Sequence, residues 1–314
     1  MSRTLANRSS AFLLDGFFSS LSAMGRVLPW SSPDRYGVEV IKNISYGPHD
    51  DANLLDIWRP KESEGSLPVV VYIHGGGFRS LKKDSHWLMA LILAHHGYLV
   101  VNINYRLSPE HAYPAHIQDA CTAWLWALEN ASEYGGDPSR MVIAGESAGA
   151  NLTMALTVAC CYQRPEPWAK AVYDAGVVPK VVAPACGIYQ VSDVRRYRRE
   201  GLSNWFAQSI LDDCEDCYLP EDEQRAHPGL ADPVCIIEQG EPDRTLPPAF
   251  LPVGGRDPLK ADNHRMNQAL AARGVETLER LYPGEPHAFH ALIFRKAARA
   301  CWREMLTFLE ERID

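Results

Sequence analysis

The sequence predicts an α/β fold with a mainly parallel sheet and helices on both of its faces. Six apolar runs have the length of buried parallel strands, at residues 68–73, 98–105, 141–145, 178–183, 249–253 and 277–282. Helical stretches alternate with them, near residues 86–96, 115–130, 149–163, 260–273 and 290–312. Because this alternation needs crossover connections, it covers both faces of the sheet and places functional sites at the carboxyl ends of the strands.

Two further strands are expected before the alternation begins. They lie at residues 38–45 and 54–58 and are separated by a polar turn that contains Gly47, Pro48 and Asp50. Such a turn favours an antiparallel pair.

The composition is that of an ordinary globular protein. Of the 314 residues 46% are hydrophobic, and 31 basic against 39 acidic residues give a net charge of -8. This balance excludes a mainly disordered chain and argues against a nucleic-acid-binding surface, which needs a basic face. The longest apolar runs, residues 67–73 and 87–94, are far shorter than the roughly 20 residues of a membrane-spanning helix.

The cysteines indicate a reducing compartment. The eight of them are too dilute for a disulfide scaffold, and most lie in apolar contexts. Cys214 and Cys217 have metal-ligand spacing, but no second cysteine pair follows, so we expect no metal there. The apolar stretch at 11–18 weakly resembles a signal peptide, yet Asp15 interrupts it and no cleavage site follows. We therefore expect a cytoplasmic protein.

Two segments lie outside the strand–helix alternation. Near the N-terminus, seven apolar residues share one helical stripe: Leu13, Leu14, Phe17, Phe18, Leu21, Met24 and Leu28. This helix either packs on the body or covers a pocket as a lid. A membrane-surface helix is disfavoured because its polar face is rich in serine rather than lysine.

The second segment, residues 191–246, is a long insertion between two expected strands. It holds 13 acidic residues and six arginines, and this difference of -7 is nearly the whole net charge of the chain. We interpret it as a cap with a solvated outer face, although its arginine cluster at 195–199 would also suit an anionic substrate. The expected organisation is an N-terminal helical part of the cap at 1–45, a core at 46–190 and 247–314, and the cap insertion at 191–246.

A candidate nucleophile follows the expected strand at 141–145. Gly145-Glu146-Ser147-Ala148-Gly149 leads from that strand directly into a helical stretch. A tight strand-to-helix turn lifts a serine hydroxyl clear of the backbone, and the positions two before and two after it must be small because strand and helix nearly touch. The pattern therefore favours Ser147 as a nucleophile.

A glycine-rich loop follows the expected strand at 68–73. His74-Gly75-Gly76-Gly77-Phe78 has three consecutive glycines, whose bare amides can approach a developing oxyanion. We assign the oxyanion hole to the amides of Gly76, Gly77 and Ala148. A phosphate-binding loop is excluded, because no G-K-[ST] and no dinucleotide fingerprint accompanies the glycines.

A serine nucleophile needs a base, and the base needs a carboxylate to hold its tautomer. Asp257 follows the expected strand at 249–253, and His287 follows the last strand in a Pro/Gly loop. Each group thus lies past its own strand, so Ser147, Asp257 and His287 can converge at one edge of the sheet. The rivals are weaker, since His290 is expected inside the C-terminal helix and Asp262 a turn into its own helix. Two other histidines, His111 and His116, are interpreted as surface or loop residues.

These motifs together resemble the hormone-sensitive-lipase-like, HGGG-type family of α/β-hydrolase carboxylesterases. The similarity runs from about Leu67 to the C-terminus and rests on HGGGF (74–78), YRLSPE (105–110), GDPSR (136–140), GESAG (145–149), DPL (257–259) and HAF (287–289). The resemblance implies an α/β-hydrolase fold and a triad of Ser147, Asp257 and His287. It also implies an oxyanion hole at the glycines, with His74, Gly75 and Glu146 as supporting motif residues, and a lid built from the N-terminus and a mid-chain insertion.

The sequence departs from the family pattern without losing a triad member. Glu146 replaces the usual Asp of the elbow, and Ala261 stands where an acid is common. Alanine also replaces a common glycine at Ala150 and at Ala288. The segments 105–110 and 136–140 are expected to support the loops of the site rather than to contact substrate.

The sequence thus predicts a serine carboxylesterase that cleaves small to medium acyl esters through an acyl-enzyme on Ser147. Its partner is a small-molecule ester, no metal or organic cofactor is required, and the resemblance allows a homodimer. Acyl transfer, amide cleavage or lactone cleavage would use the same triad. A non-catalytic ligand-binding member of the fold is disfavoured because all three triad residues are present.

Overall fold

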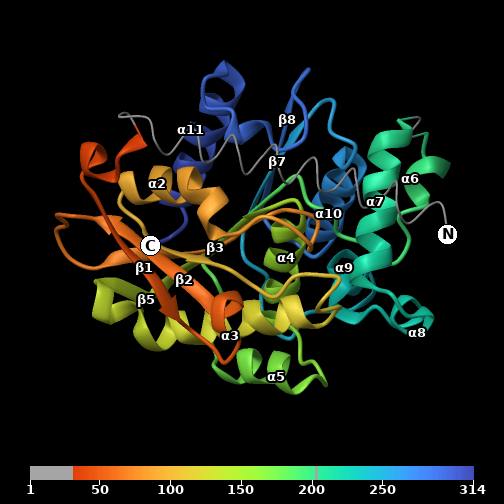
Figure 1. Ribbon diagram of the computed structural model, residues 1–314, viewed down its shortest axis with the longest axis horizontal. Helices are drawn as coiled ribbons and strands as arrows, with labels where there is room; N and C mark the ends of the chain where they lie inside the picture. Colours follow the sequence, from red (N-terminus) through yellow and green to blue (C-terminus); the bar gives the residue numbers. More distant parts are fainter. Residues whose placement is uncertain (1–30, 202–203) are drawn as a thin grey trace.

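The central sheet has eight strands in the part of the chain that the computed structural model describes, residues 31–201 and 204–314 (Figure 1). The order is β1-β2-β4-β3-β5-β6-β7-β8. The strands are β1 (Val38–Ser45), β2 (Leu54–Pro60), β3 (Leu67–Ile73), β4 (Leu99–Ile103), β5 (Gly136–Glu146), β6 (Val181–Ala185), β7 (Ala249–Gly254) and β8 (Thr277–Tyr282). β2 is antiparallel to β1 and to β4, and the remaining pairs are parallel. The predicted mainly parallel sheet with its antiparallel first pair is confirmed.

Helices occupy the connections between the strands. They are α2 (Trp87–His95), α3 (Ala115–Asn130), α4 (Ala148–Cys161), α5 (Pro167–Asp174), α6 (Arg196–Arg199), α7 (Trp205–Tyr218), α8 (Asp222–Ala226), α9 (Pro233–Gln239), α10 (Lys260–Ala272) and α11 (Lys296–Glu310). Short 3-10 turns are η2 (Pro33–Tyr36), η3 (Asp50–Asn53), η4 (Lys83–His86), η5 (Ala131–Tyr134), η6 (Gly229–Ala231) and η7 (Phe289–Ala291). None of the helices in the described residues is long and apolar enough to cross a membrane. The predicted helix at 13–28 lies outside the described residues.

The last helix corrects the sequence-based expectation. The sequence predicts a helical stretch near 290–312, but the chain makes the turn η7 first and α11 begins only at Lys296. Ala288 has a left-handed backbone (φ 53°), and the carbonyl of His290 accepts a hydrogen bond from Trp302 Nε1. These features hold residues 288–291 in a separate turn, so His290 lies in η7 rather than in the helix.

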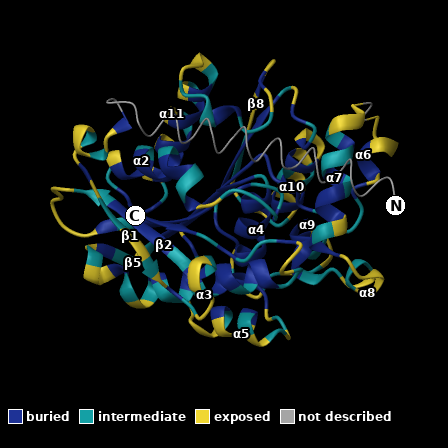
Figure 2. Cartoon of the chain, in the orientation of Figure 1, coloured by how far each residue is buried: buried dark blue, intermediate teal, exposed yellow. Residues whose placement is uncertain are grey.

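The core lies on both faces of the sheet. In β3, Val69 and Val71 belong to the apolar cluster that includes residues of α3, α4 and α10, whereas Val70 and Tyr72 pack with α2 and α11. The dark strands of Figure 2 show the same burial across the sheet. Because both faces are covered, β3 is apolar at nearly every position rather than at alternate ones.

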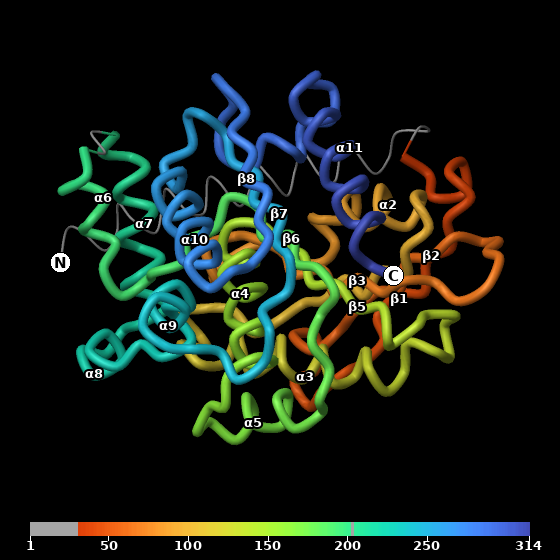
Figure 3. Tube along the Cα trace, turned by 180° about the vertical axis from the view of Figure 1, so that it is seen from behind, coloured from red at the N-terminus to blue at the C-terminus, as the bar shows by residue number. Residues whose placement is uncertain are grey.

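The strand register brings the loops of interest to one edge. Ile73 of β3 pairs with Gly145 of β5, and Glu146 of β5 pairs with Ala185 of β6. The loops that follow these parallel strands therefore leave the sheet side by side. Helices α6 to α9, between β6 and β7, gather at the end of the molecule away from β1 and β2 (Figure 3).

Candidate active site

The turn between β5 and α4 presents Ser147. Its backbone is strained, with φ 55° and ψ -117°, and its amide donates to the carbonyl of Ala185 at 2.9 Å. A side chain at Gly145 would lie 2.6 Å from the carbonyl oxygen of Gly149, and one at Gly149 would collide with the carbonyl oxygen of Ile73. The strand and the helix therefore touch as the sequence predicts, and both glycines are required by this close approach.

The three candidate catalytic side chains meet at the carboxyl edge of the sheet. Nε2 of His287 lies 3.0 Å from Oγ of Ser147, and its Nδ1 lies 2.8 Å from Oδ2 of Asp257. The other carboxylate oxygen of Asp257 accepts the amide of Leu259 at 2.8 Å. His287 is thus joined in one hydrogen-bonded chain to residues that precede it by 140 and 30 positions in the sequence.

The charge of His287 is set by two opposing effects. Burial disfavours the imidazolium, but the carboxylate of Asp257, together with the adjacent Cys186, outweighs burial and holds the pKa of His287 well above its usual value. Asp257 is buried, whereas about a third of the His287 side chain is exposed (34%). The imidazole can therefore reach a ligand in the adjoining cavity while its partner remains shielded from water.

The glycine loop after β3 has a backbone that only small residues adopt easily. Gly76 and Gly77 have φ values of 112° and 60°. A side chain at Gly76 would collide with the carbonyl of Ser80, and one at Gly77 would lie 2.7 Å from Sγ of Cys214. Gly76, Gly77 and Ser147 line the same cavity, so the loop brings its backbone to the cavity beside Ser147.

Buried aromatic groups hold this loop from behind. His74 stacks on Tyr105, whose hydroxyl donates to the carbonyl of His74 at 2.9 Å. Burial lowers the pKa of His74 to about 3, so the ring is neutral. The carbonyl of Phe78 accepts the amide of Ser108 at 2.8 Å. The segment 105–110 therefore supports the loop, as expected from the sequence.

His116 corrects another sequence-based interpretation. The sequence suggests a surface or loop position for His116, but the residue is fully buried in α3. Its Nε2 lies 3.0 Å from the carbonyl oxygen of Phe78, and burial lowers its pKa to about 3. The apolar periodicity of α3 places position 116 on the inner face of the helix. A surface position is nevertheless suggested by the sequence because histidine is a polar residue.

A cavity of about 320 Å³ opens beside Ser147. Loop residues and the core supply one wall and α7 supplies another. The lining residues are Gly76, Gly77, Arg79, Ser80, Leu81, Glu146, Ser147, Ile188, Phe206, Ala207, Ile210, Leu211, Asp213, Cys214, Pro258, Leu259, His287 and Ala288. Its exposed surface is mainly apolar, and its charged pair, Arg79 and Asp213, forms an ion pair.

Comparison with known proteins identifies the chain. Its sequence matches the family described as alpha/beta hydrolase fold over residues 70–291. The chain belongs to this family. Over 268 residues it is 31% identical to carboxylesterase NlhH of Mycobacterium tuberculosis (strain CDC 1551 / Oshkosh), covering 83% of this chain and 79% of that protein. Over 235 residues it is 31% identical to versiconal hemiacetal acetate esterase of Dothistroma septosporum (strain NZE10 / CBS 128990), covering 74% and 70%.

Solved structures share the fold of this hydrolase. A bacterial heroin esterase superimposes with a TM-score of 0.78 at 24% identity, over 96% of this chain and 91% of that one. Esterase B from Lactobacillus rhamnosis gives a TM-score of 0.79 at 18% identity, over 99% and 96%. The relatives and the fold make the chain a serine carboxylesterase of the hormone-sensitive-lipase-like group, as the motifs indicate.

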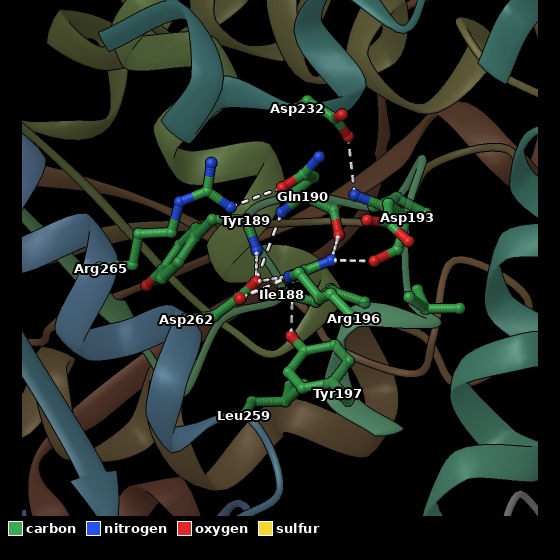
Figure 4. A network of polar contacts seen from close by, with 12 residues as sticks. Ile188, Tyr189, Gln190, Asp193, Arg196, Tyr197, Asp232, Leu259, Asp262 and Arg265 are labelled. Atoms are coloured by element: carbon green, nitrogen blue, oxygen red, sulfur yellow. Dashed lines mark hydrogen bonds and ion pairs between the residues drawn. The ribbon is translucent and has the colours of Figure 1, made fainter. Parts of the chain in front are cut away.

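A polar network fixes the start of the insertion in this esterase to its core (Figure 4). Arg196 donates to both carboxylate oxygens of Asp262 at 2.6 Å, and the amide of Tyr189 donates to Asp262 Oδ2 at 2.7 Å. Asp232 accepts the amide of Val191 at 2.7 Å. The network holds the segment that contains Ile188, a residue of the cavity wall.

The arginine cluster of the insertion is largely neutralised. Arg196 is buried against Asp262, while Arg198 pairs with Asp212 and Arg199 with Asp193. Cys214 and Cys217 lie on α7, where Cys214 faces the cavity. These contacts favour structural roles for the cluster over recognition of an anion.

Cys186 is a site residue that sequence analysis missed. It follows β6, has φ 43° and is buried beside the candidate triad. Among the described residues, Cys186, Asp257 and His287 form the group whose possible metal-ligand atoms lie within 4.8 Å of one another. Because His287 and Asp257 already bond each other, we assign the group to the triad. Cys186 follows a predicted strand, and this position at the carboxyl end of the strand could have identified it from the sequence.

Proposed function

We propose that Ser147 is the nucleophile of this carboxylesterase, that His287 is its general base and acid, and that Asp257 orients His287. The chain of two short contacts from Ser147 Oγ to His287 and on to Asp257 carries the proposal. As Oγ attacks the ester carbonyl carbon, Nε2 of neutral His287 takes its proton. The carboxylate of Asp257 accepts the Nδ1–H hydrogen bond, which fixes the tautomer and stabilises the imidazolium.

We assign the oxyanion hole to the amides of Gly76, Gly77 and Ala148. The positive φ of both glycines and the absence of room for a Cβ support this assignment. Ala148 opens α4, where the first amides have no acceptor within the helix. The three amides would donate to the carbonyl oxygen as it gains negative charge, and one such donor is typically worth about 10²–10³ in rate.

The remaining steps follow from the same groups. Collapse of the tetrahedral intermediate breaks the ester C–O bond, and the imidazolium of His287 protonates the departing alcohol. The acyl group stays on Ser147 Oγ. A water molecule then attacks it while His287 accepts a proton, and the acid leaves as Ser147 recovers its hydrogen.

The cavity supports a preference for small to medium acyl groups. Its volume is about 320 Å³ and its apolar wall includes Ile188, Phe206 and Leu211. The contribution of α7 to this wall supports a cap formed by residues 191–246. A panel of nitrophenyl esters graded by acyl length, with the matching anilides, tests this preference. We expect the highest kcat/KM for short and medium esters and far lower values for amides.

Replacement of the nucleophile tests the mechanism directly. Ser147→Ala removes the attacking oxygen, so ester hydrolysis should fall by about 10⁴-fold or more while the fold persists. The measurement is turnover of a short-chain nitrophenyl ester, with a thermal melt to verify folding. We also expect a serine-reactive phosphonate to label the wild-type protein but not the variant. Turnover retained by a folded Ser147→Ala protein would reject the assignment.

We also propose a cellular location and an assembly state for the protein. All eight cysteines are free, which supports a reducing, cytoplasmic location. The family resemblance supports a homodimer, and light scattering of the purified protein tests it.

A further inference from the structure

Three buried side chains that the proposed reaction does not use meet next to the nucleophile. They are Glu146, His86 and His290, and they are 6%, 3% and 2% exposed. Oε1 of Glu146 lies 2.8 Å from Nε2 of His86. Oε2 lies 2.7 Å from Nε2 of His290, an ion-pair distance without the alignment of a well-formed hydrogen bond. One carboxylate therefore holds an imidazole at each of its oxygens.

The three side chains come from the three segments that carry the proposed reacting groups. Glu146 directly precedes Ser147 at the end of β5. His86 ends η4, just beyond the glycine loop, and its Nε2 lies 3.3 Å from the amide of Gly75. His290 lies in η7, three residues after His287. The carboxylate thus connects the nucleophile turn, the oxyanion loop and the histidine loop.

The electrostatics make this a charged connection. Burial by itself would raise the pKa of Glu146, but His86 and then His290 outweigh burial and hold that pKa well below its usual range. The other titratable groups around the carboxylate are His74, Tyr72, Tyr105 and Cys186. Burial keeps each of these four neutral. The imidazoles of His86 and His290 are therefore the groups that stabilise the Glu146 anion.

We propose that Glu146 is a positioning residue, which acts with His86 and His290 to hold the oxyanion loop and the His287 loop in register with Ser147. This inference rests on the proposed function, because register matters only if those groups react. Glutamate is one methylene longer than the aspartate that the family usually has at this position. We infer that the extra length lets one carboxylate reach both imidazoles.

Glu146→Gln tests the proposal because it keeps the shape and removes the charge. We expect kcat to fall about 10- to 100-fold with KM changed less than twofold, since misplaced reacting groups affect the transition state more than ground-state binding. His290→Gln should cause a similar loss, and the double variant should be little worse than either single one. Glu146→Asp should recover part of kcat, because it restores the charge.

The control is Glu215→Gln, at another buried glutamate that does not line the cavity, assayed at about pH 8. Burial raises the pKa of Glu215 to about 7, so at that pH the substitution removes a mostly ionised carboxylate. It should leave kcat and KM unchanged. Should Glu146→Gln fail to fold in a thermal melt, Glu146→Asp and His290→Gln carry the same test. Three results would overturn the proposal. The folded variants could keep the kcat of the wild type, or KM could rise by the whole factor lost in kcat/KM. The third result is a loss in the double variant equal to the product of the two single losses. If Ser147→Ala retains activity, the proposed function fails instead, so the two failures are distinguishable.

Discussion

At the scale of single residues, the environment of His287, the proposed base, sets the pH dependence that we expect for the activity. The ring must be neutral to accept a proton from Ser147, and Asp257 stabilises its charged form. In the proposed mechanism, Asp257 therefore orients the base and also makes its imidazolium harder to deprotonate. Cys186 lies against the same ring but has no part in the proposed proton transfer.

The acid limb of the pH profile follows from this pKa. Because the pKa of His287 is raised, its neutral form is reached only at pH values above the usual range of histidine. We expect kcat/KM to rise with pH through a single ionisation lying above about 6.5, the unperturbed value for histidine. Initial rates on a short-chain ester from pH 5 to pH 9 measure it. A flat profile over that range would contradict histidine as the base.

At the scale of elements, the glycine loop after β3 depends on backbone geometry that its neighbours fix. Tyr105, Ser108 and His116 all bond carbonyl groups of this loop or its flanks. The loop therefore has little freedom to adjust when a side chain is added.

Gly76→Ala should displace the loop. The new Cβ would meet the carbonyl of Ser80, and alanine is strained at φ 112°. We expect kcat to fall by about 10²-fold or more, comparable to the loss of one oxyanion donor. Gly65→Ala is the matched control, since Gly65 also has a positive φ (85°) but open space around it. Equal, small effects of the two substitutions on kcat would argue against the oxyanion assignment.

At the scale of the whole molecule, the insertion is fixed to the core by a buried ion pair. Arg196 comes from α6 and Asp262 from α10, and the side chains are 7% and 2% exposed. Between them they also hold the backbone of residues 189–193. The position of the insertion over the sheet therefore depends on a contact between segments 66 residues apart.

Arg196→Met should lower stability because it leaves the Asp262 carboxylate buried without its cationic partner. A broken buried pair typically costs about 3–5 kcal/mol in free energy of unfolding. Urea denaturation measures the loss. The matched control is Arg198→Met, whose pair with Asp212 is exposed and should contribute at most about 1 kcal/mol. Similar losses in both variants would show that burial of the Arg196 pair is not what matters.

Local patterns in the sequence are sufficient to predict the sheet and the order of its elements, and to propose the candidate triad. Local patterns specify these features: apolar runs predict buried strands, and Ser147, Asp257 and His287 each follow such a run. The glycines around Ser147 indicate that strand and helix approach each other closely at this turn. This requirement is local and does not depend on the rest of the chain.

The side chains that surround the candidate triad become apparent only in the folded chain. The carboxylate of Glu146 meets His86 and His290, and Arg196 meets Asp262, through contacts between segments that no local pattern connects. A buried polar residue such as His116 looks like a surface residue until its partner is known. The physical reason is that local sequence sets backbone preference and burial pattern, whereas polar partners are chosen by how distant segments pack.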